Sequence, residues 1–178
     1  PLIVREPGQK KKGRTQEAMI SWVDLAPTLL DYAGVDLSES ALHGRSFKKG
    51  VSGKLKNWDH IFASHTNHEA TMYYPMRVIK NRQYKLIFNI AHGLEFPLAK
   101  DLLQSPTWVS MQKNGLKLYG KRTPEALLHR PRIELYDLQA DPHEVVNLSE
   151  NPEYAKIRDS MIAQLKEFQA DTRDPWGI

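Results

Sequence analysis

Tyr73-Tyr-Pro-Met-Arg-Val-Ile-Lys80 and Tyr84-Lys-Leu-Ile-Phe-Asn-Ile90 flank a short polar connection, Asn81-Arg-Gln83. Both runs are rich in the aromatic and β-branched residues that strands favour. A short polar connection between two such runs is typical of a β-hairpin. The pattern therefore predicts two neighbouring antiparallel strands, around which a sheet can form.

Two further strand-like runs extend the predicted sheet. Ile61 to His65 lies before the hairpin, and Ile133-Glu-Leu-Tyr-Asp137 lies after it. Between them, residues 91–131 have no sustained period and contain four prolines, so we expect a long excursion with one or two short helices. Ala140-Asp-Pro-His143 predicts a turn in which the aspartate accepts backbone hydrogen bonds.

The clearest helix signal lies near the C-terminal end of the sequence. Large apolar side chains recur there at spacings of three and four residues, with charged residues between them, which predicts an amphipathic helix. Asn151 before Pro152 offers a cap followed by a proline at the first helical position. The apolar positions are Tyr154, Ile157, Met161, Ile162, Leu165 and Phe168.

The first part of the chain follows another pattern. Leu2 to Val4 is an apolar run typical of a strand buried on both faces of a parallel sheet, and a chain that opens inside such a strand predicts a fragment of a longer parent. Residues 23–33 have helical apolar spacing, and Gly34 is placed to end a core-packed helix of about three turns. Residues 36–57 are polar and predict a connection, with a boundary near residue 50.

Composition narrows the class of protein. The 178 residues are 40% hydrophobic, which is enough for a real core. No run approaches the roughly 20 apolar residues of a membrane span, and no signal peptide opens the chain. The lack of cysteine excludes disulfides and thiolate nucleophiles. A net charge of +4 suits an anionic partner, but the basic run Lys10 to Lys12 reads as a solvated loop and does not favour nucleic acid.

Candidate chemistry is concentrated in residues 67–77. Glu69 suits acceptance of hydrogen bonds from sugar hydroxyls, His68 suits donation to an anion, and Arg77 suits a forked contact with sulfate, phosphate or carboxylate. These three residues predict an anionic-sugar pocket, with His65 as a weaker candidate. The alternative is a plain strand end whose Arg77 pairs with a surface carboxylate, and the residues alone leave both open.

A metal site at the same residues is a poorer interpretation. His65, His68 and Glu69 supply three ligands from one short segment, without a fourth ligand and without helical His-x-x-x-His spacing. The sequence also contains no glycine-rich phosphate loop and no recognisable Ser-His-Asp arrangement. We therefore expect neither a catalytic nucleophile nor a metal ligand in this chain, and binding is favoured over catalysis.

Over nearly the whole chain, the order of several motifs resembles that in the later part of sulfatases. Within that family the sulfamidase group, the N-sulfoglucosamine sulfohydrolases, is the most similar on His68-Glu69, Thr71-Met-Tyr-Tyr-Pro-Met-Arg77 and Asp174-Pro-Trp176. The motifs that carry the wider resemblance are Pro1-Leu-Ile-Val-Arg-Glu-Pro-Gly8, Ser21-Trp-Val-Asp-Leu-Ala-Pro-Thr-Leu-Leu-Asp-Tyr-Ala-Gly34, His43-Gly-Arg-Ser-Phe47 and Glu134-Leu-Tyr-Asp-Leu-Gln-Ala-Asp-Pro-His-Glu144.

The resemblance implies an α/β parent of the alkaline-phosphatase-like fold. Residues 1–50 would be the end of its large α/β domain, and residues 51–178 a C-terminal α+β subdomain with a small antiparallel sheet packed by a last helix. It also implies a formylglycine nucleophile and a Ca²⁺ ion, and the motifs that supply both are missing from this sequence, so they would lie upstream. We therefore expect the segment alone to be inactive and to complete the substrate pocket through His68, Glu69, Arg77 and His65.

The function implied is hydrolysis of sulfate from a sulfated sugar by the parent, in the first place the N-sulfate of glucosamine in heparan sulfate. The expected partners are a sulfated glycosaminoglycan or its oligosaccharides and the remainder of the sulfatase chain, with no nucleic acid and no membrane span. The expected location is periplasmic or extracellular in a bacterium and lysosomal in a eukaryote. Two alternatives remain: an O-sulfatase acting on another sulfated glycan, and a noncatalytic carbohydrate-binding module.

Overall fold

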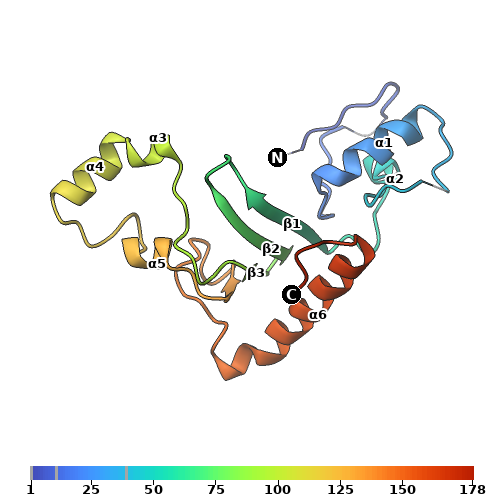
Figure 1. Cartoon of the computed structure of the whole chain (residues 1–178). Coiled ribbons are helices and arrows are strands. Elements are labelled where there is room, and N and C mark those ends of the chain that lie inside the picture. The colour runs from blue at the N-terminus through green and yellow to red at the C-terminus, as the bar shows by residue number, and fades with distance from the viewer. Residues whose placement is uncertain (1, 11, 39) are drawn as a thin grey trace. The chain divides into compact units, whose positions relative to one another are not determined.

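The structure, a computed structural model, describes residues 2–10, 12–38 and 40–178 (Figure 1). Two positions used above, Pro1 of the opening run and Lys11 of the basic run, lie outside this range. The chain forms two compact units, residues 1–61 and 62–178. The predicted domain boundary near residue 50 of the parent stays a prediction. In the described residues no helix is long and apolar enough to cross a membrane.

Within the described residues, the predicted strands form one four-stranded sheet in the order β1-β2-β3-β4. The pairs β2–β3 and β3–β4 are antiparallel, as predicted. Asn81 explains the tight β2–β3 connection, because its Oδ1 accepts hydrogen bonds from the backbone N–H of Gln83 at 2.9 Å and of Tyr84 at 2.6 Å. The strands are β1 (His60–Asn67), β2 (Tyr73–Asn81), β3 (Tyr84–Asn89) and β4 (Ile133–Asp137).

The register gives the sheet two different faces. Ile79 lies opposite Leu86, which lies opposite Leu135, so these three side chains share one face. On the other face Ile87 lies opposite Glu134. The first face is the core side, and the second carries buried polar groups.

Helix α6 (Ala155–Asp171) covers the core face of the sheet, as Figure 1 shows. A short 3₁₀ turn, η2 (Pro152–Tyr154), precedes it, and the predicted cap is present: Asn151 Oδ1 accepts from the N–H of Glu153 at 3.0 Å. Burying each large apolar side chain contributes about 1.5–3 kcal/mol. The fully buried cluster consists of Ile79, Leu86, Phe88, Leu135, Met161 and Leu165, with Tyr154, Ile157 and Ile162 packed against it.

The excursion between β3 and β4 contains three short helices in the described chain, where one or two were predicted. They are α3 (Lys100–Leu103), α4 (Pro106–Lys113) and α5 (Pro124–Leu128). Two of the prolines start helices instead of breaking them. Ser105 Oγ caps α4 through the N–H of Trp108 at 3.2 Å, and Thr123 Oγ1 caps α5 through the N–H of Ala126 at 3.1 Å.

The first unit is built around η1 (Trp22–Asp24), α1 (Leu25–Tyr32) and α2 (Lys48–Ser52). The buried carboxylate of Asp24 accepts backbone hydrogen bonds from Ser21 and from Arg45, both at 2.8 Å. These bonds tie the start of the helical segment to the loop before α2. Gly34 ends α1 as predicted, with a positive φ of 76°.

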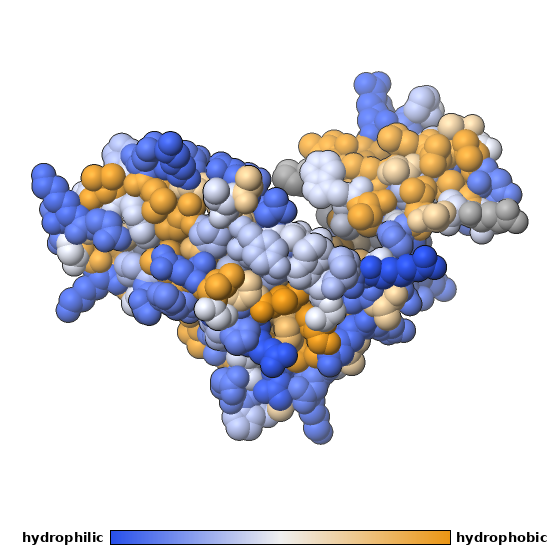
Figure 2. Space-filling model, viewed as in Figure 1, coloured by the Kyte–Doolittle hydropathy of each residue, from blue (hydrophilic) through white to orange (hydrophobic). Residues whose placement is uncertain are grey.

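Two predictions for this unit are wrong. No strand forms at residues 2–4, where Ile3 is 92% exposed, and the helix is not core-packed, since Leu29 is 68% exposed. A strand needs hydrogen-bonded neighbours and an apolar helix face needs a covering element, and the described residues supply neither. Apolar residues accordingly gather on the surface of this unit, in orange in Figure 2.

Among the described glycines of the first unit, Gly44 is the one where an added Cβ would meet the closest atom. A Cβ placed there would lie 1.9 Å from the carbonyl oxygen of Val23. We expect Gly44→Ala to lower the unfolding free energy of this unit by about 1–3 kcal/mol through forced backbone displacement. Thermal unfolding measures the effect, with Gly93→Ala as control, because a Cβ at Gly93 meets nothing within 4 Å. Equal melting temperatures for the two variants would contradict this packing.

Candidate functional site at the β1–β2 hairpin

The turn between β1 and β2 carries His68 and Glu69, the two predicted site residues that are exposed. The N–H of His68 donates to the carbonyl of Met72 at 3.4 Å, and the N–H of Met72 donates to the carbonyl of Glu69 at 2.9 Å. Met72 is buried and anchors the turn, whereas His68 and Glu69 are exposed. Neither of these two side chains has a hydrogen bond or ion pair with a residue that the structure describes, so both are free to meet a ligand.

His65 lies on β1 and is half-buried. Its Nδ1 is 3.1 Å from the carbonyl oxygen of Tyr74. Because a carbonyl oxygen only accepts, Nδ1 carries the hydrogen and a neutral ring leaves Nε2 as an acceptor. His65 is therefore fixed in orientation, and its second nitrogen can accept a hydrogen bond.

Arg77 is buried, with 3% exposure, and all three of its guanidinium nitrogens donate hydrogen bonds. Nε and Nη2 donate to the two carboxylate oxygens of Asp174, the latter at 2.7 Å. Nη1 donates to the carbonyls of His65 at 3.1 Å and Met76 at 2.9 Å. The forked hydrogen bond from Arg77 holds the pKa of Asp174 well below its usual range.

Arg77 thus forms an ion pair with a carboxylate, which was the alternative to a sugar contact. The carboxylate of Asp174 is largely buried, however, and not at the surface as that alternative supposed. Arg77 joins β1, β2 and the segment after α6. In this arrangement Arg77 stabilises the β1–β2 hairpin through its buried contacts. Direct contact between Arg77 and a substrate anion stays a prediction.

The segment after α6 folds back onto β2 through the same carboxylate. The N–H of Trp176 donates to Asp174 Oδ1 at 3.0 Å, and Gln169 Nε2 donates to Asp174 Oδ2 at 3.1 Å and to the carbonyl of Trp176 at 2.5 Å. The indole Nε1 of Trp176 donates to the hydroxyl oxygen of Tyr73 at 3.0 Å. Asp174, Gln169 and Trp176 are residues to which the sequence assigned no role, since no spacing rule joins them to the hairpin.

A second polar cluster lies under the excursion, on the other face of the sheet. Glu134 is 2% exposed, and its carboxylate accepts from Asn89 Nδ2 at 2.7 Å and from the hydroxyl of Tyr136 at 2.5 Å. Arg130 Nε is 3.0 Å from the same carboxylate, close but poorly aligned for a hydrogen bond. Burial, followed by the Glu134 contact, raises the pKa of Tyr136. The cluster is closed to solvent and fastens the excursion to the sheet.

The predicted site residues do not form a metal site. Among the residues that the structure describes, no three or more histidine, aspartate or glutamate side chains converge in a way that could hold an ion. The calcium implied by the resemblance therefore has no fit in these residues. What the hairpin offers is hydrogen bonding: an acceptor at Glu69, a donor or acceptor nitrogen at His68, and an acceptor nitrogen at His65.

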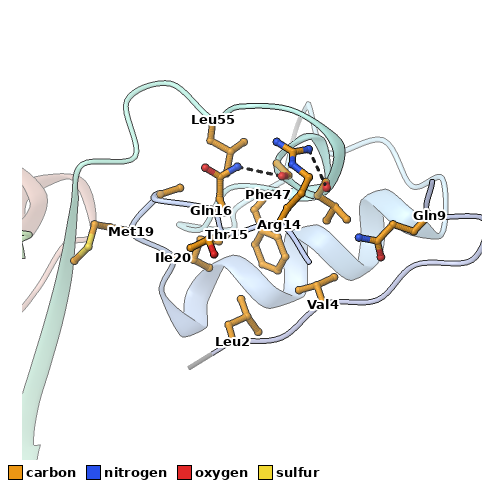
Figure 3. A pocket seen from close by; sticks show the side chains of 13 residues that line it. Leu2, Val4, Gln9, Arg14, Thr15, Gln16, Met19, Ile20, Phe47 and Leu55 are labelled. Atoms are coloured by element: carbon orange, nitrogen blue, oxygen red, sulfur yellow. Dashed lines mark hydrogen bonds between the residues drawn. The ribbon is translucent and has the colours of Figure 1, made fainter. Parts of the chain in front are cut away.

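A cavity of about 480 Å³ in the first unit is a weaker candidate (Figure 3). Leu2, Val4 and Phe47 form apolar parts of its wall. Two of its polar side chains already make hydrogen bonds, since Arg14 Nη2 donates to the carbonyl of Gly53 at 3.1 Å and Gln16 Nε2 to that of Gly50 at 3.1 Å. The wall of the cavity is therefore a mixture of polar and apolar groups.

Comparison with known proteins identifies the family. The family described as N-sulphoglucosamine sulphohydrolase, C-terminal, matches residues 1–113. The chain belongs to this sulfatase family. Human N-sulphoglucosamine sulphohydrolase is 33% identical over 99% of the chain and 37% of its own length. An N-acetylglucosamine-6-O-sulfatase of Bacteroides thetaiotaomicron is 29% identical over 98% of the chain and 25% of its own length.

Solved structures show the fold of this sulfatase segment. A 2-O GAG sulfatase aligns over 86% of the chain and 25% of its own length, with a TM-score of 0.57 and 21% identity. A protein solved with its substrate D-glucosamine-2-N,6-O-disulfate aligns over 85% of the chain, with a TM-score of 0.55 and 24% identity. The fold is that of the C-terminal portion of the alkaline-phosphatase-like sulfatases. The chain spans about a quarter to about a third of the length of these relatives.

Proposed function

We propose that this chain is the segment of a sulfatase that completes the pocket for a sulfated sugar, and that the parent hydrolyses the N-sulfate of glucosamine in heparan sulfate. The observation that carries the proposal is the pair His68 and Glu69, exposed on the β1–β2 turn and without a side-chain partner among the residues that the structure describes. Membership of the N-sulphoglucosamine sulphohydrolase family and the human relative of that name support the substrate class.

The chemistry of the hairpin matches a sulfated amino sugar. Such a ligand presents hydroxyl donors and anionic oxygens. The Glu69 carboxylate accepts from hydroxyls, and the His68 ring donates to a sulfate oxygen, most strongly when it is protonated. His65, whose Nδ1 is already bonded, adds an acceptor at the edge. Arg77, itself held by Asp174, donates to the backbone carbonyl of His65 and so stabilises β1 just before the turn.

The chemical step belongs to other parts of the parent. We propose that a formylglycine nucleophile and a Ca²⁺ ion upstream supply the covalent chemistry and charge stabilisation of sulfate hydrolysis. Within the described residues, the contribution of this chain is binding and orientation. A parent that acts on heparan sulfate would work outside the cytoplasm: in the periplasm or extracellularly in a bacterium, and in the lysosome of a eukaryote.

Substitution of Glu69 by glutamine in the full-length parent tests the proposal. Loss of one charge-assisted hydrogen bond predicts a fall in kcat/KM for glucosamine N-sulfate of about 10- to 100-fold. Glu167→Gln is a matched control, because Glu167 is exposed on α6 and lies outside the hairpin. The proposal fails if the parent cleaves the sugar and Glu69→Gln cleaves it equally well.

A second candidate is O-sulfatase activity on another glycan. It is favoured by the relatives named N-acetylglucosamine-6-O-sulfatase and ulvan-active sulfatase. The ratio of kcat/KM for glucosamine N-sulfate to that for glucosamine 6-O-sulfate discriminates the two activities. The third interpretation, an independent carbohydrate-binding module, fits poorly with Leu29 and Ile3 lying exposed on the first unit.

A further inference from the structure

Tyr73 is the first residue of β2 and directly follows the turn that carries His68 and Glu69. Tyr73 is 48% exposed. Its hydroxyl oxygen lies 3.0 Å from Nε1 of Trp176, a residue 103 positions further along the chain. The phenol therefore belongs to the residue that directly follows the candidate turn, is open to solvent, and has one hydrogen bond already made.

The chemistry of the indole fixes the direction of that bond. An indole N–H can only donate, so the hydroxyl oxygen of Tyr73 is the acceptor. The hydroxyl hydrogen of Tyr73 is left without an acceptor among the described residues. It is available to an acceptor that comes from outside the chain.

The position of Trp176 is fixed by buried groups. Its backbone N–H is held by Asp174 and its carbonyl by Gln169, as described above, and its ring centre lies 5.6 Å from the guanidinium carbon of Arg77. The direction from which the indole N–H approaches the Tyr73 hydroxyl oxygen is therefore fixed by the contacts of Trp176 with Asp174, Gln169 and Arg77. A hydroxyl oriented in this way is a preorganised donor.

We propose that Tyr73 is a specificity-determining contact that donates its hydroxyl hydrogen to an anionic oxygen of the saccharide bound at His68 and Glu69, and that Trp176 is the positioning residue for this donor. The proposal rests on the proposed function. A sulfate oxygen and a carboxylate oxygen of a neighbouring uronate share the chemistry that Tyr73 recognises. The phenol adds a neutral donor beside the ionisable ring of His68.

The test compares Tyr73→Phe with the wild type in the full-length parent. The substitution removes one oxygen atom and keeps the ring, so we expect KM to rise about tenfold, as for the loss of a hydrogen bond to a charged acceptor, with kcat within about twofold. Tyr119→Phe is the control, since Tyr119 packs against Trp108 in the excursion. Melting temperatures of both variants show whether folding is retained.

Two substrates separate the two sources of the anionic oxygen. Glucosamine N-sulfate offers only the sulfate, and a disaccharide of glucosamine N-sulfate with a uronate offers both. A rise in KM with both substrates assigns Tyr73 to the sulfate, and a rise with the disaccharide alone assigns it to the uronate. Unchanged KM with both, in a parent that cleaves them, overturns this inference alone. A folded parent that cleaves neither overturns the proposed function as well.

The role of Trp176 is tested by a double-variant cycle. If Trp176 acts through Tyr73, Trp176→Phe raises KM in the wild-type background and has no further effect on KM in the Tyr73→Phe background. A merely structural role for the indole would give additive changes in KM. Additive changes would therefore overturn the assignment of Trp176 as positioning residue.

Discussion

An Asp174→Ala variant is expected to lose about 3–5 kcal/mol of unfolding free energy, the cost of leaving a buried charge without its partner. The guanidinium of Arg77 would remain in an environment where it is 3% exposed. Two of its hydrogen bonds would disappear, and Trp176 and Gln169 would lose their shared acceptor. The loss should therefore exceed that of an ordinary surface ion pair, which is worth about 0–1 kcal/mol.

Urea unfolding of the chain, followed by circular dichroism, measures this loss. Asp171→Ala is a matched control, because Asp171 is an exposed aspartate at the end of α6. We expect the control to change the unfolding free energy by less than about 0.5 kcal/mol. If both variants lost the same unfolding free energy, the Arg77–Asp174 pair would not be the stabilising contact that the structure indicates.

The same pair adds an acid-side pH dependence to this prediction. The pKa of Asp174 in the folded chain lies below its ordinary value of 3.8, so the folded state favours the carboxylate. The stabilisation is complete above that ordinary value and is lost as the pH falls through the lower, folded pKa. An Asp174→Asn variant should therefore lose less unfolding free energy than the wild type when the pH falls below about 4.

Glu134→Ala is expected to destabilise the second unit by a similar amount, about 3–5 kcal/mol. The change strands Arg130 beside the sheet and removes the acceptor of Asn89 and Tyr136. Urea unfolding measures the effect. Glu153→Ala is the control, because Glu153 is exposed before α6. A small effect of Glu134→Ala would mean that water satisfies the stranded groups and that the cluster does not fasten the excursion.

The sequence predicted the sheet and the last helix because both rest on local periodicity. The alternation in Tyr73–Asn81 and the three- and four-residue spacing in Ala155–Asp171 express which face of each element is buried. The sequence predicts too few helices in the excursion because a proline is typical of an interruption. In Ser105-Pro106 and Thr123-Pro124 the residue before the proline is a cap, and together they start a helix.

The candidate site was predicted only in part for a different physical reason. His68 and Glu69 lie together in the sequence, so their proximity needed no knowledge of the fold. The carboxylate that holds Arg77 and the indole that orients Tyr73 come from residues 174–176, and no period or local motif connects such distant positions. The errors in the first unit have a similar origin. The apolar spacing of residues 23–33 predicts that one helix face is covered, but no described residues cover it.

The ion pair between Arg77 and Asp174 joins residues 97 positions apart. At the usual pace of translation, about 5–20 residues per second, the ribosome completes Asp174 about 5–20 s after Arg77. Throughout that delay the nascent hairpin carries a cation that it cannot bury at low cost. We therefore expect this unit to acquire its native packing only when nearly all of it has been synthesised, and to be a client for chaperones until then.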